Sequence, residues 1–296
     1  MKINLIGVPI HYGCDLKGAD LAPDIIRNKM AQNHYEHEFY DFGNLYIPKI
    51  ETETKYYAHP KIKFFDSIVD VNKNLAHAVY CSLHANSFPL VIGGDHSIAV
   101  GSISGASKYC KNLAVIWVDA HSDIHTDLTT SSGNLHGMSL AAVIGEGPKE
   151  LTNLYFKGKK VRAENVFIIG ARSIDEGEAL LIKRKNISVF STDYIKKYGT
   201  SNIINEINLH LKKNNIDYVH FSFDIDCLDP SIVNGTGTPE PNGLSVEDAK
   251  SIIKKIFGTK LVKSMDLVEY NPLLDKNKQT LNIVLQIIQF ALTQLH

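Results

Sequence analysis

The sequence predicts an α/β protein in which a central, mainly parallel sheet lies between two layers of helices, with residues 1–296 forming one domain. The first observation is that short apolar runs alternate with longer segments of helical spacing along the whole chain. The second is that several of these runs are apolar at consecutive positions, which is typical of strands covered on both faces. No segment rich in proline and serine interrupts the alternation, so nothing indicates a second domain.

Short runs enriched in isoleucine, valine and phenylalanine are the predicted strands. In chain order they are residues 3–8, 89–92, 114–118, 166–169, 188–190, 218–223 and 262–267. Branched and aromatic side chains suit a pleated surface that is packed against helices. Ligands of open parallel sheets bind beyond the carboxyl ends of the strands, so the residues after each run are the first candidates for a site.

Segments between these runs have apolar residues at helical spacing and are the predicted helices. They are residues 23–32, 67–83, 176–185, 203–212, 246–256 and 281–295. Ser245 and Asp248 have the spacing of a capping box at the start of the fifth helix. Residues 46–63 are polar and aperiodic, and we expect them to form an excursion on the surface.

The composition excludes several classes of protein. The 31 Lys plus Arg residues nearly balance the 32 Asp plus Glu residues, so no overall positive field attracts nucleic acid. No apolar run approaches the roughly 18–20 residues that span a bilayer, so we expect no membrane partner. The four cysteines include no Cys-x-x-Cys pair, and the first apolar run is too short for a signal peptide. These features predict a cytoplasmic protein with free thiols.

Acidic residues and histidines follow four of the predicted strands. The segments are GGDHS at 93–97, DAHSD at 119–123, DID at 224–226 and VE at 268–269. Because the carboxyl ends of parallel strands meet at one edge of a sheet, we expect these side chains to lie together. The predicted metal ligands are His96, Asp119, His121, Asp123, Asp224 and Asp226.

Most of these ligands are spaced two residues apart. Side chains of an extended segment alternate between its faces, so residues at positions i, i+2 and i+4 project together. Four carboxylates gathered in this way would repel one another unless cations lay among them. Four carboxylates and two imidazoles therefore suit two divalent ions a few ångströms apart. Mixed oxygen and nitrogen ligands favour Mn²⁺, with zinc as an open alternative. Such a pair can hold a bridging hydroxide, which is a strong nucleophile for hydrolysis.

Each motif also has a structural interpretation when it is taken alone. His96 could cap a helix, and an Asp-x-Asp pair is usually part of a solvated turn. Gly93 and Gly94 could belong to a phosphate-binding loop, but no Gly-x-Gly-x-x-Gly and no following Lys-Ser or Lys-Thr supports nucleotide binding. The GGDHS, DAHSD and DID motifs together, each at the end of an apolar run, favour the metal site.

The motifs in this order resemble the ureohydrolase family of arginases and agmatinases. The resemblance covers most of the chain and extends to GADLAP at 18–23, SFDID at 222–226, GTP at 237–239 and DLVE at 266–269. It implies an α/β fold, two Mn²⁺ ions per chain and an assembly into trimers or hexamers. One ion would bind His96, Asp119, Asp123 and Asp224. The other would bind His121, Asp119, Asp224 and Asp226, so that two aspartates bridge.

Arginases are the most similar branch of this family. The SSGNLHG stretch at 131–137 resembles the arginase segment in which Ser132 and Asn134 would bind the substrate carboxylate and His136 would shuttle a proton. The resemblance places Asp175, with Glu178 beside it, at the substrate α-amino group. Two structural alternatives stay open: Ser132 and Asn134 could form a turn, and Asp175 could cap the following helix.

The resemblance implies hydrolysis of L-arginine to L-ornithine and urea by attack of a metal-bridging hydroxide on the guanidinium carbon. Asp123 would orient the hydroxide, and Glu269 would hold the guanidinium with support from Thr238. His136 would protonate the leaving amine.

One departure keeps other substrates open. Arginases usually carry Asn at the position of His125, which contacts the substrate carboxylate. Imidazole can also donate to a carboxylate, so arginine remains the preferred substrate. The alternative substrates are agmatine, guanidinobutyrate or another guanidino acid. A further alternative is that the chain is a catalytically silent binding protein.

Overall fold

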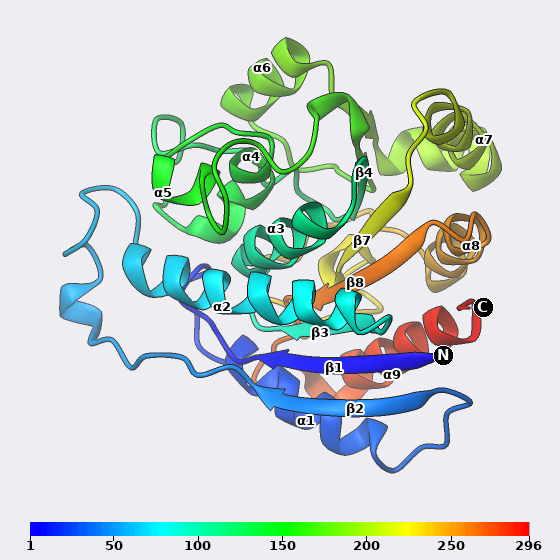
Figure 1. Cartoon of the computed structure of the whole chain (residues 1–296), viewed down its shortest axis with the longest axis horizontal. Coiled ribbons are helices and arrows are strands. Elements are labelled where there is room, and N and C mark those ends of the chain that lie inside the picture. Colours follow the sequence, from blue (N-terminus) through cyan, green and yellow to red (C-terminus); the bar gives the residue numbers. More distant parts are fainter. Residues whose placement is uncertain (296) are drawn as a thin grey trace.

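The computed structural model describes residues 1–295, and its centre is an eight-stranded sheet (Figure 1). The strands are β1 (Lys2–Val8), β2 (Glu38–Asn44), β3 (Phe88–Gly93), β4 (Leu113–Val118), β5 (Val166–Ile169), β6 (Ser188–Phe190), β7 (Tyr218–Asp224) and β8 (Val262–Val268). Their order across the sheet is β2-β1-β3-β8-β7-β4-β5-β6, and every neighbouring pair is parallel. This confirms the predicted α/β class with a parallel sheet.

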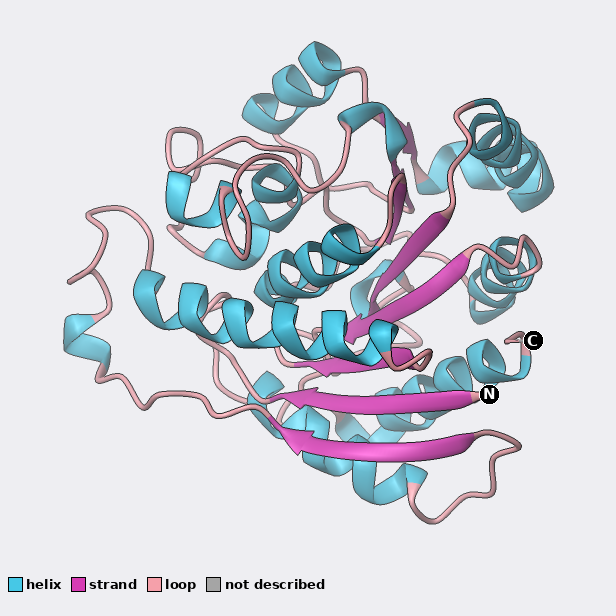
Figure 2. Cartoon of the chain, in the orientation of Figure 1, coloured by secondary structure: helices cyan, strands magenta, loops and turns pink. Residues whose placement is uncertain are grey.

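Helices cover both faces of the sheet (Figure 2). They are α1 (Ala22–Met30), α2 (Phe65–His84), α3 (Ala99–Tyr109), α4 (Ser139–Val143), α5 (Lys149–Thr152), α6 (Glu176–Lys185), α7 (Thr192–Lys213), α8 (Val246–Phe257) and α9 (Gln279–Thr293). One apolar core joins the sheet to α1, α7, α8 and α9, and the other joins it to α2 through α6. Strand β4 shows the alternation: Ile116 lies in the first core, while Val115 and Trp117 lie in the second.

The predicted elements are present within a few residues of their expected bounds. The short helices α4 and α5 were not predicted, and there are three further differences. Strand β2 was not predicted, because it is a polar edge strand whose side chains are mostly exposed. Helix α3 was not predicted, because its small Ala, Gly and Ser side chains are buried nearly all round and leave little amphipathic pattern. The predicted helix 203–212 is the second part of α7, which is kinked at Gly199. The expected excursion at 46–63 loops away from the sheet (Figure 1).

The order of the strands brings the four acidic motifs together. The strands that precede them are β3, β4, β7 and β8, and these are the four adjacent central strands of the sheet, in the order β3-β8-β7-β4. The chain runs from β4 outward to one edge through β5 and β6, and then returns to β7 and β8 on the other side of β4. A reversal of this kind opens a crevice at the carboxyl ends of the strands.

No helix among the described residues is long and apolar enough to cross a bilayer.

Gly94 has a packing role at this edge of the sheet. Its N–H donates to the carbonyl of Val8 at 3.0 Å, and the N–H of Asp95 donates to the carbonyl of Ile10 at 3.0 Å. A Cβ atom on Gly94 would lie 1.8 Å from the Ile10 carbonyl oxygen. Only glycine therefore allows the chain after β3 to pass so close to the end of β1.

We predict that Gly94→Ala destabilises the protein by about 3 kcal/mol or more, because backbone must move to accept the methyl group. Gly93→Ala should cost less, since its Cβ would meet the side chains of Val268 and Ile98 instead of a carbonyl. Chemical denaturation of the two variants, followed by circular dichroism, measures the difference. Equal stability of Gly94→Ala and the parent protein would contradict this account.

Candidate functional site

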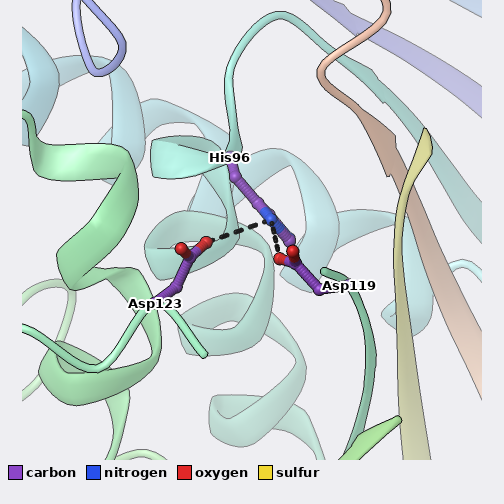
Figure 3. A group of neighbouring side chains, drawn as sticks. All are labelled: His96, Asp119 and Asp123. Carbon is purple, nitrogen blue, oxygen red and sulfur yellow. Dashed lines mark ion pairs between the residues drawn. The ribbon is translucent and has the colours of Figure 1, made fainter. Parts of the chain in front are cut away.

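His96 lies at the centre of a buried group of carboxylates (Figure 3). It begins a 3₁₀ turn, His96–Ile98, which Asp95 caps by accepting the N–H of Ser97. The Nδ1 atom of His96 is 3.0 Å from Asp119, 3.2 Å from Asp123 and 3.2 Å from Asp224, measured to a carboxylate oxygen of each. None of these contacts has the alignment of a hydrogen bond, so the buried Nδ1 has no such partner among the described residues. A positive charge, from a proton or a metal ion, must therefore lie between these groups.

A second ligand group shares one aspartate with the first. Nδ1 of His121 is 3.3 Å from Asp119 and 3.1 Å from Asp226. Ligand atoms of these three residues, and separately of His96, Asp119 and Asp123, lie close enough together to hold one ion each. Asp119 belongs to both groups, so two ions bound here would be neighbours.

The residues converge by turns and not by an extended backbone, so the expectation of side-chain alternation was wrong. Strand β7 ends at Asp224, and a 3₁₀ turn at Ile225–Cys227 folds Asp226 back so that its N–H donates to Asp224 Oδ1 at 2.8 Å. His121 forms only an isolated bridge with Ser173. Asp123 and Glu269 have left-handed backbones, with φ of 49° and 64°. Non-glycine residues in this conformation are uncommon and are concentrated at functional sites.

The electrostatics of the cluster fit divalent cations. Burial, together with the neighbouring Asp119, raises the pKa of Asp123 to about 6. Burial, with Asp226 and Asp119 beside it, raises the pKa of Asp224 well above its usual value. The pKa of Asp119 is lowered, because His121 and His96 outweigh the effect of its burial. Carboxylates that resist ionisation until a cation neutralises them, with the unpartnered His96 nitrogen, form a donor set that suits Mn²⁺.

Two outer residues orient the ligands, and sequence reasoning gave neither a role. The hydroxyl of Ser222 lies 2.8 Å from Nε2 of His96, which leaves Nδ1 free to face the carboxylates. Trp117 donates its indole N–H to Asp119 at 2.9 Å and stacks on the His96 ring at 3.9 Å between centroids. Ser222 was visible in the SFDID motif, whereas Trp117 looked like an ordinary strand residue.

A cleft of about 200 Å³ opens next to the ligand groups. Its lining includes all the residues predicted for the substrate and one ligand from each group: His125, Ser132, Asn134, Asp175, Glu178, Thr238, His121 and Asp123. His136 also lines it. The structure thus brings the predicted metal half and the predicted substrate half of the site together.

His136 and Glu269 form a pair beside the first ligand group. Nδ1 of His136 is 3.0 Å from Oε1 of Glu269, which also accepts the backbone N–H of His96 at 2.8 Å. Burial lowers the pKa of His136, but the carboxylates of Glu269, Asp123 and Asp95 together outweigh it and raise the pKa to about 9. This histidine therefore holds a proton at neutral pH in the protein without cations.

The two residues predicted at the substrate α-amino group also start helix α6. Asp175 accepts the N–H of Glu178, and Glu178 accepts the N–H of Asp175, which is a capping box. Glu178 Oε1 also accepts the Ser122 hydroxyl at 2.6 Å. Asp175 therefore caps helix α6, as the structural alternative proposed. The second carboxylate oxygen of Asp175 lies 3.0 Å from Nε2 of His125.

The structural alternative for Ser132 and Asn134 is present as well. The N–H of Asn134 donates to the Ser132 hydroxyl oxygen at 3.2 Å and closes a turn. The Asn134 side chain accepts from Lys63 at 2.8 Å and donates to the Cys14 carbonyl at 3.0 Å. The Lys63 ammonium, which also pairs with Asp15 at 2.9 Å, lies beside this end of the cleft. It was not predicted, because it lies in the aperiodic excursion, where nothing in the sequence marks it.

Arg172 ties the loops of the site together. Its guanidinium donates to six backbone carbonyls, which belong to Gly170, Asp226, Cys227, Leu228, Glu240 and Pro241. The same loops are joined where the Thr238 hydroxyl donates to Asp226 Oδ2 at 3.0 Å. The turn that presents Asp226 and the loop at 238–241 are thus held against each other.

Comparisons with known proteins agree with this geometry. A model described as "Arginase family" matches residues 1–293. An arginase of Staphylococcus aureus (strain COL) is 41% identical over 283 residues, which cover 94% of this chain and 92% of that protein. The crystal structure of arginase from Bacillus subtilis has a TM-score of 0.89 and 35% identity over 98% of both chains. The Entamoeba histolytica arginase in complex with L-ornithine has a TM-score of 0.88 and 32% identity, covering 98% of this chain and 97% of that one.

We predict that Mn²⁺ stabilises the metal-stripped protein, because it neutralises carboxylates that repel one another only in the folded state. At a free concentration 100 times the Kd, one bound ion adds about 2.7 kcal/mol to the free energy of unfolding. Thermal unfolding with and without Mn²⁺ measures this effect. Asp226→Asn should reduce the shift, whereas the exposed Asp193→Asn serves as a control. A full shift in Asp226→Asn would remove Asp226 from the ligand set.

Proposed function

Because the chain belongs to the arginase family, we propose that it hydrolyses L-arginine to L-ornithine and urea with two Mn²⁺ ions bound per chain. The observation that carries this proposal is the pair of buried ligand groups that share Asp119 beside a polar cleft. The cleft offers an anionic group for a cationic substrate and hydrogen-bond donors for a carboxylate. The relatives named arginase add the substrate class.

The two ions would be held by the residues that the structure gathers. One would bind His96, Asp119, Asp123 and Asp224, and the other would bind Asp119, His121, Asp224 and Asp226. Ions bound there would supply a strong oxygen nucleophile from water at neutral pH. The predominance of oxygen ligands favours Mn²⁺ over zinc.

The residues next to the cluster would orient the reactants. Asp123 would accept a hydrogen bond from the nucleophile. Glu269 would hold the guanidinium by a charge-assisted pair, and Thr238 would keep Asp226 in place through its hydroxyl. His136, held at Nδ1 by Glu269, would carry on Nε2 the proton that it delivers to the leaving ornithine amine.

The opposite wall of the cleft would recognise the amino acid part of the substrate. Ser132 and Asn134 would bind the carboxylate. The α-amino group would bind the outer oxygen of Asp175, while Glu178, already occupied by Ser122 and the α6 cap, would act by fixing Asp175. His125 would donate to the carboxylate and must then release its contact with Asp175.

A second candidate function is hydrolysis of another guanidino compound, such as agmatine or guanidinobutyrate. The contact between His125 and Asp175 favours this alternative, since it occupies the carboxylate that an α-amino group would use. Lys63 donates to Asn134 at the end of the cleft where a carboxylate would bind, but its charge is paired with Asp15 at 2.9 Å and gives arginine little further advantage.

We predict urea release from L-arginine, at a higher kcat/KM than from agmatine, when purified protein is loaded with Mn²⁺. A panel of arginine, agmatine and guanidinobutyrate at one pH, scored by urea formation, makes the comparison. His125→Asn should increase the preference for arginine, because the amide can donate to the carboxylate without holding Asp175. A higher kcat/KM for agmatine than for arginine would show that arginine is not the preferred substrate. If the protein binds the ions but releases urea from none of these compounds, the result would favour a catalytically silent binding protein.

We predict that His136→Ala lowers kcat for arginine by about 10²- to 10⁴-fold, as expected when a general acid is lost. Its Mn²⁺ content should stay at the parent level, because His136 contacts Glu269 and no predicted ligand side chain. Steady-state kinetics and metal analysis on the same sample separate the two effects. Loss of metal in proportion to loss of rate would show that the role assigned to His136 is wrong.

Cytoplasmic location and assembly into trimers or hexamers stay predictions of the sequence and the resemblance. Sedimentation of the purified chain measures the assembly directly.

A further inference from the structure

We propose that Glu240 is the outer carboxylate that orients His121, and so acts as a positioning residue for the second metal ion. This inference rests on the proposed function, because it requires His121 to bind an ion through Nδ1. Glu240 was not among the predicted site residues.

The two ring nitrogens of His121 face different groups. Nδ1 is 3.1 Å from Asp226 and 3.3 Å from Asp119, which are the other members of its ligand group. Nε2 lies 3.8 Å from Oε1 of Glu240. Within residues 1–295 Nε2 makes no hydrogen bond, and the Glu240 carboxylate is its only ion-pair partner. The carboxylate of Glu240 is therefore placed on the side of the ring that points away from the ligand group.

A metal-binding histidine needs a partner at this position. When Nδ1 binds a cation, the proton of the neutral ring is on Nε2, and ligand histidines normally donate it to a carboxylate, a carbonyl or water. The donation fixes the ring orientation and makes the other nitrogen a stronger ligand. A separation of 3.8 Å is longer than a hydrogen bond, but the Glu240 side chain is 35% exposed and a small rotation shortens it.

The backbone of Glu240 is held in place from several sides. Pro239 and Pro241 flank it, and proline both fixes its own φ and restricts the residue before it. Arg172 donates to the carbonyls of Glu240 at 2.8 Å and Pro241 at 3.0 Å. Two residues earlier, the Thr238 hydroxyl donates to the ligand Asp226. A carboxylate on a segment fixed in this way is pre-organised to face His121.

Glu240 does not line the substrate cleft, whereas His121 does. Among the described residues the Glu240 carboxylate pairs only with His121, which places it to act on this predicted metal ligand. An effect on metal binding is therefore expected ahead of an effect on substrate binding.

The test measures Mn²⁺ binding in the absence of substrate. Parent protein, Glu240→Ala and Glu240→Gln are stripped, reloaded and then exposed to excess chelator, and the rate of metal loss and the content per chain are recorded. Glu240→Ala should bind one of its ions 10- to 100-fold more weakly, which is the usual effect of removing an outer partner of a ligand histidine. Glu240→Gln should keep most of the affinity, because its amide oxygen still accepts from Nε2–H.

The exposed Glu53→Gln, in the excursion at 46–63, is the matched control for loss of one carboxylate and should behave as the parent. Unfolding of the stripped proteins detects damage to the loop, and rescue by Glu240→Gln distinguishes positioning from such damage. Equal metal retention in Glu240→Ala and the parent overturns this inference alone. Equal loss in Glu240→Gln and Glu240→Ala overturns it as well. A parent protein that binds no Mn²⁺ overturns the proposed function together with it.

Discussion

The concentration of negative charge at one buried point determines how this site is built. Asp119, Asp123 and Asp224 are almost excluded from water and all approach the same nitrogen of His96. Two like charges about 4 Å apart repel by about 4 kcal/mol at an effective dielectric constant of 20. Repulsion of this size is a large part of the free energy of unfolding of a typical domain, which is about 5–15 kcal/mol. Protonated histidines or bound cations must offset this negative charge, so metal binding and the stability of the site are coupled.

The rest of the structure serves to hold this charge in a small volume. The strand order β3-β8-β7-β4 makes neighbours of segments that are up to about 170 residues apart in the chain, and Gly94 lets the loop after β3 pass against β1. Outside the ligands, Trp117, Ser222 and Arg172 fix Asp119, His96 and the turn at Asp226. Trp117 donates a hydrogen bond to the buried Asp119 carboxylate, and Arg172 donates to the Asp226 carbonyl, so these acceptors are not left without partners. Rigid donors around a carboxylate cluster also limit how far the ligands can move when an ion leaves.

The sequence was sufficient to predict the class of fold, most of its elements and the six acidic and histidine residues that the structure gathers at the strand ends, because buried strands and acidic motifs both leave local patterns. It was insufficient for β2 and α3, whose polar edge and small buried side chains carry no clear periodicity. The spacing of Asp224 and Asp226 predicted that the two side chains lie together, but a 3₁₀ turn and not an extended strand brings them close. Lys63 and Glu240 reach the site from loops, and long-range contacts of this kind depend on tertiary structure that no local pattern encodes.

The two halves of the site differ in how firmly they are fixed, and this difference bears on specificity. The metal half is buried, and its ligands have little freedom once the strand ends are in place. In the substrate half, Asp175 is 55% exposed on its side chain and His125 contacts it directly. A substrate with an α-amino group must separate this pair, whereas a guanidino compound without one can leave it intact. The chemistry is therefore set by the strand ends, and the choice among guanidino substrates is set by a few exposed contacts whose energies are small. Substitutions at His125 and Asp175 are accordingly expected to change substrate preference without disturbing the metal half.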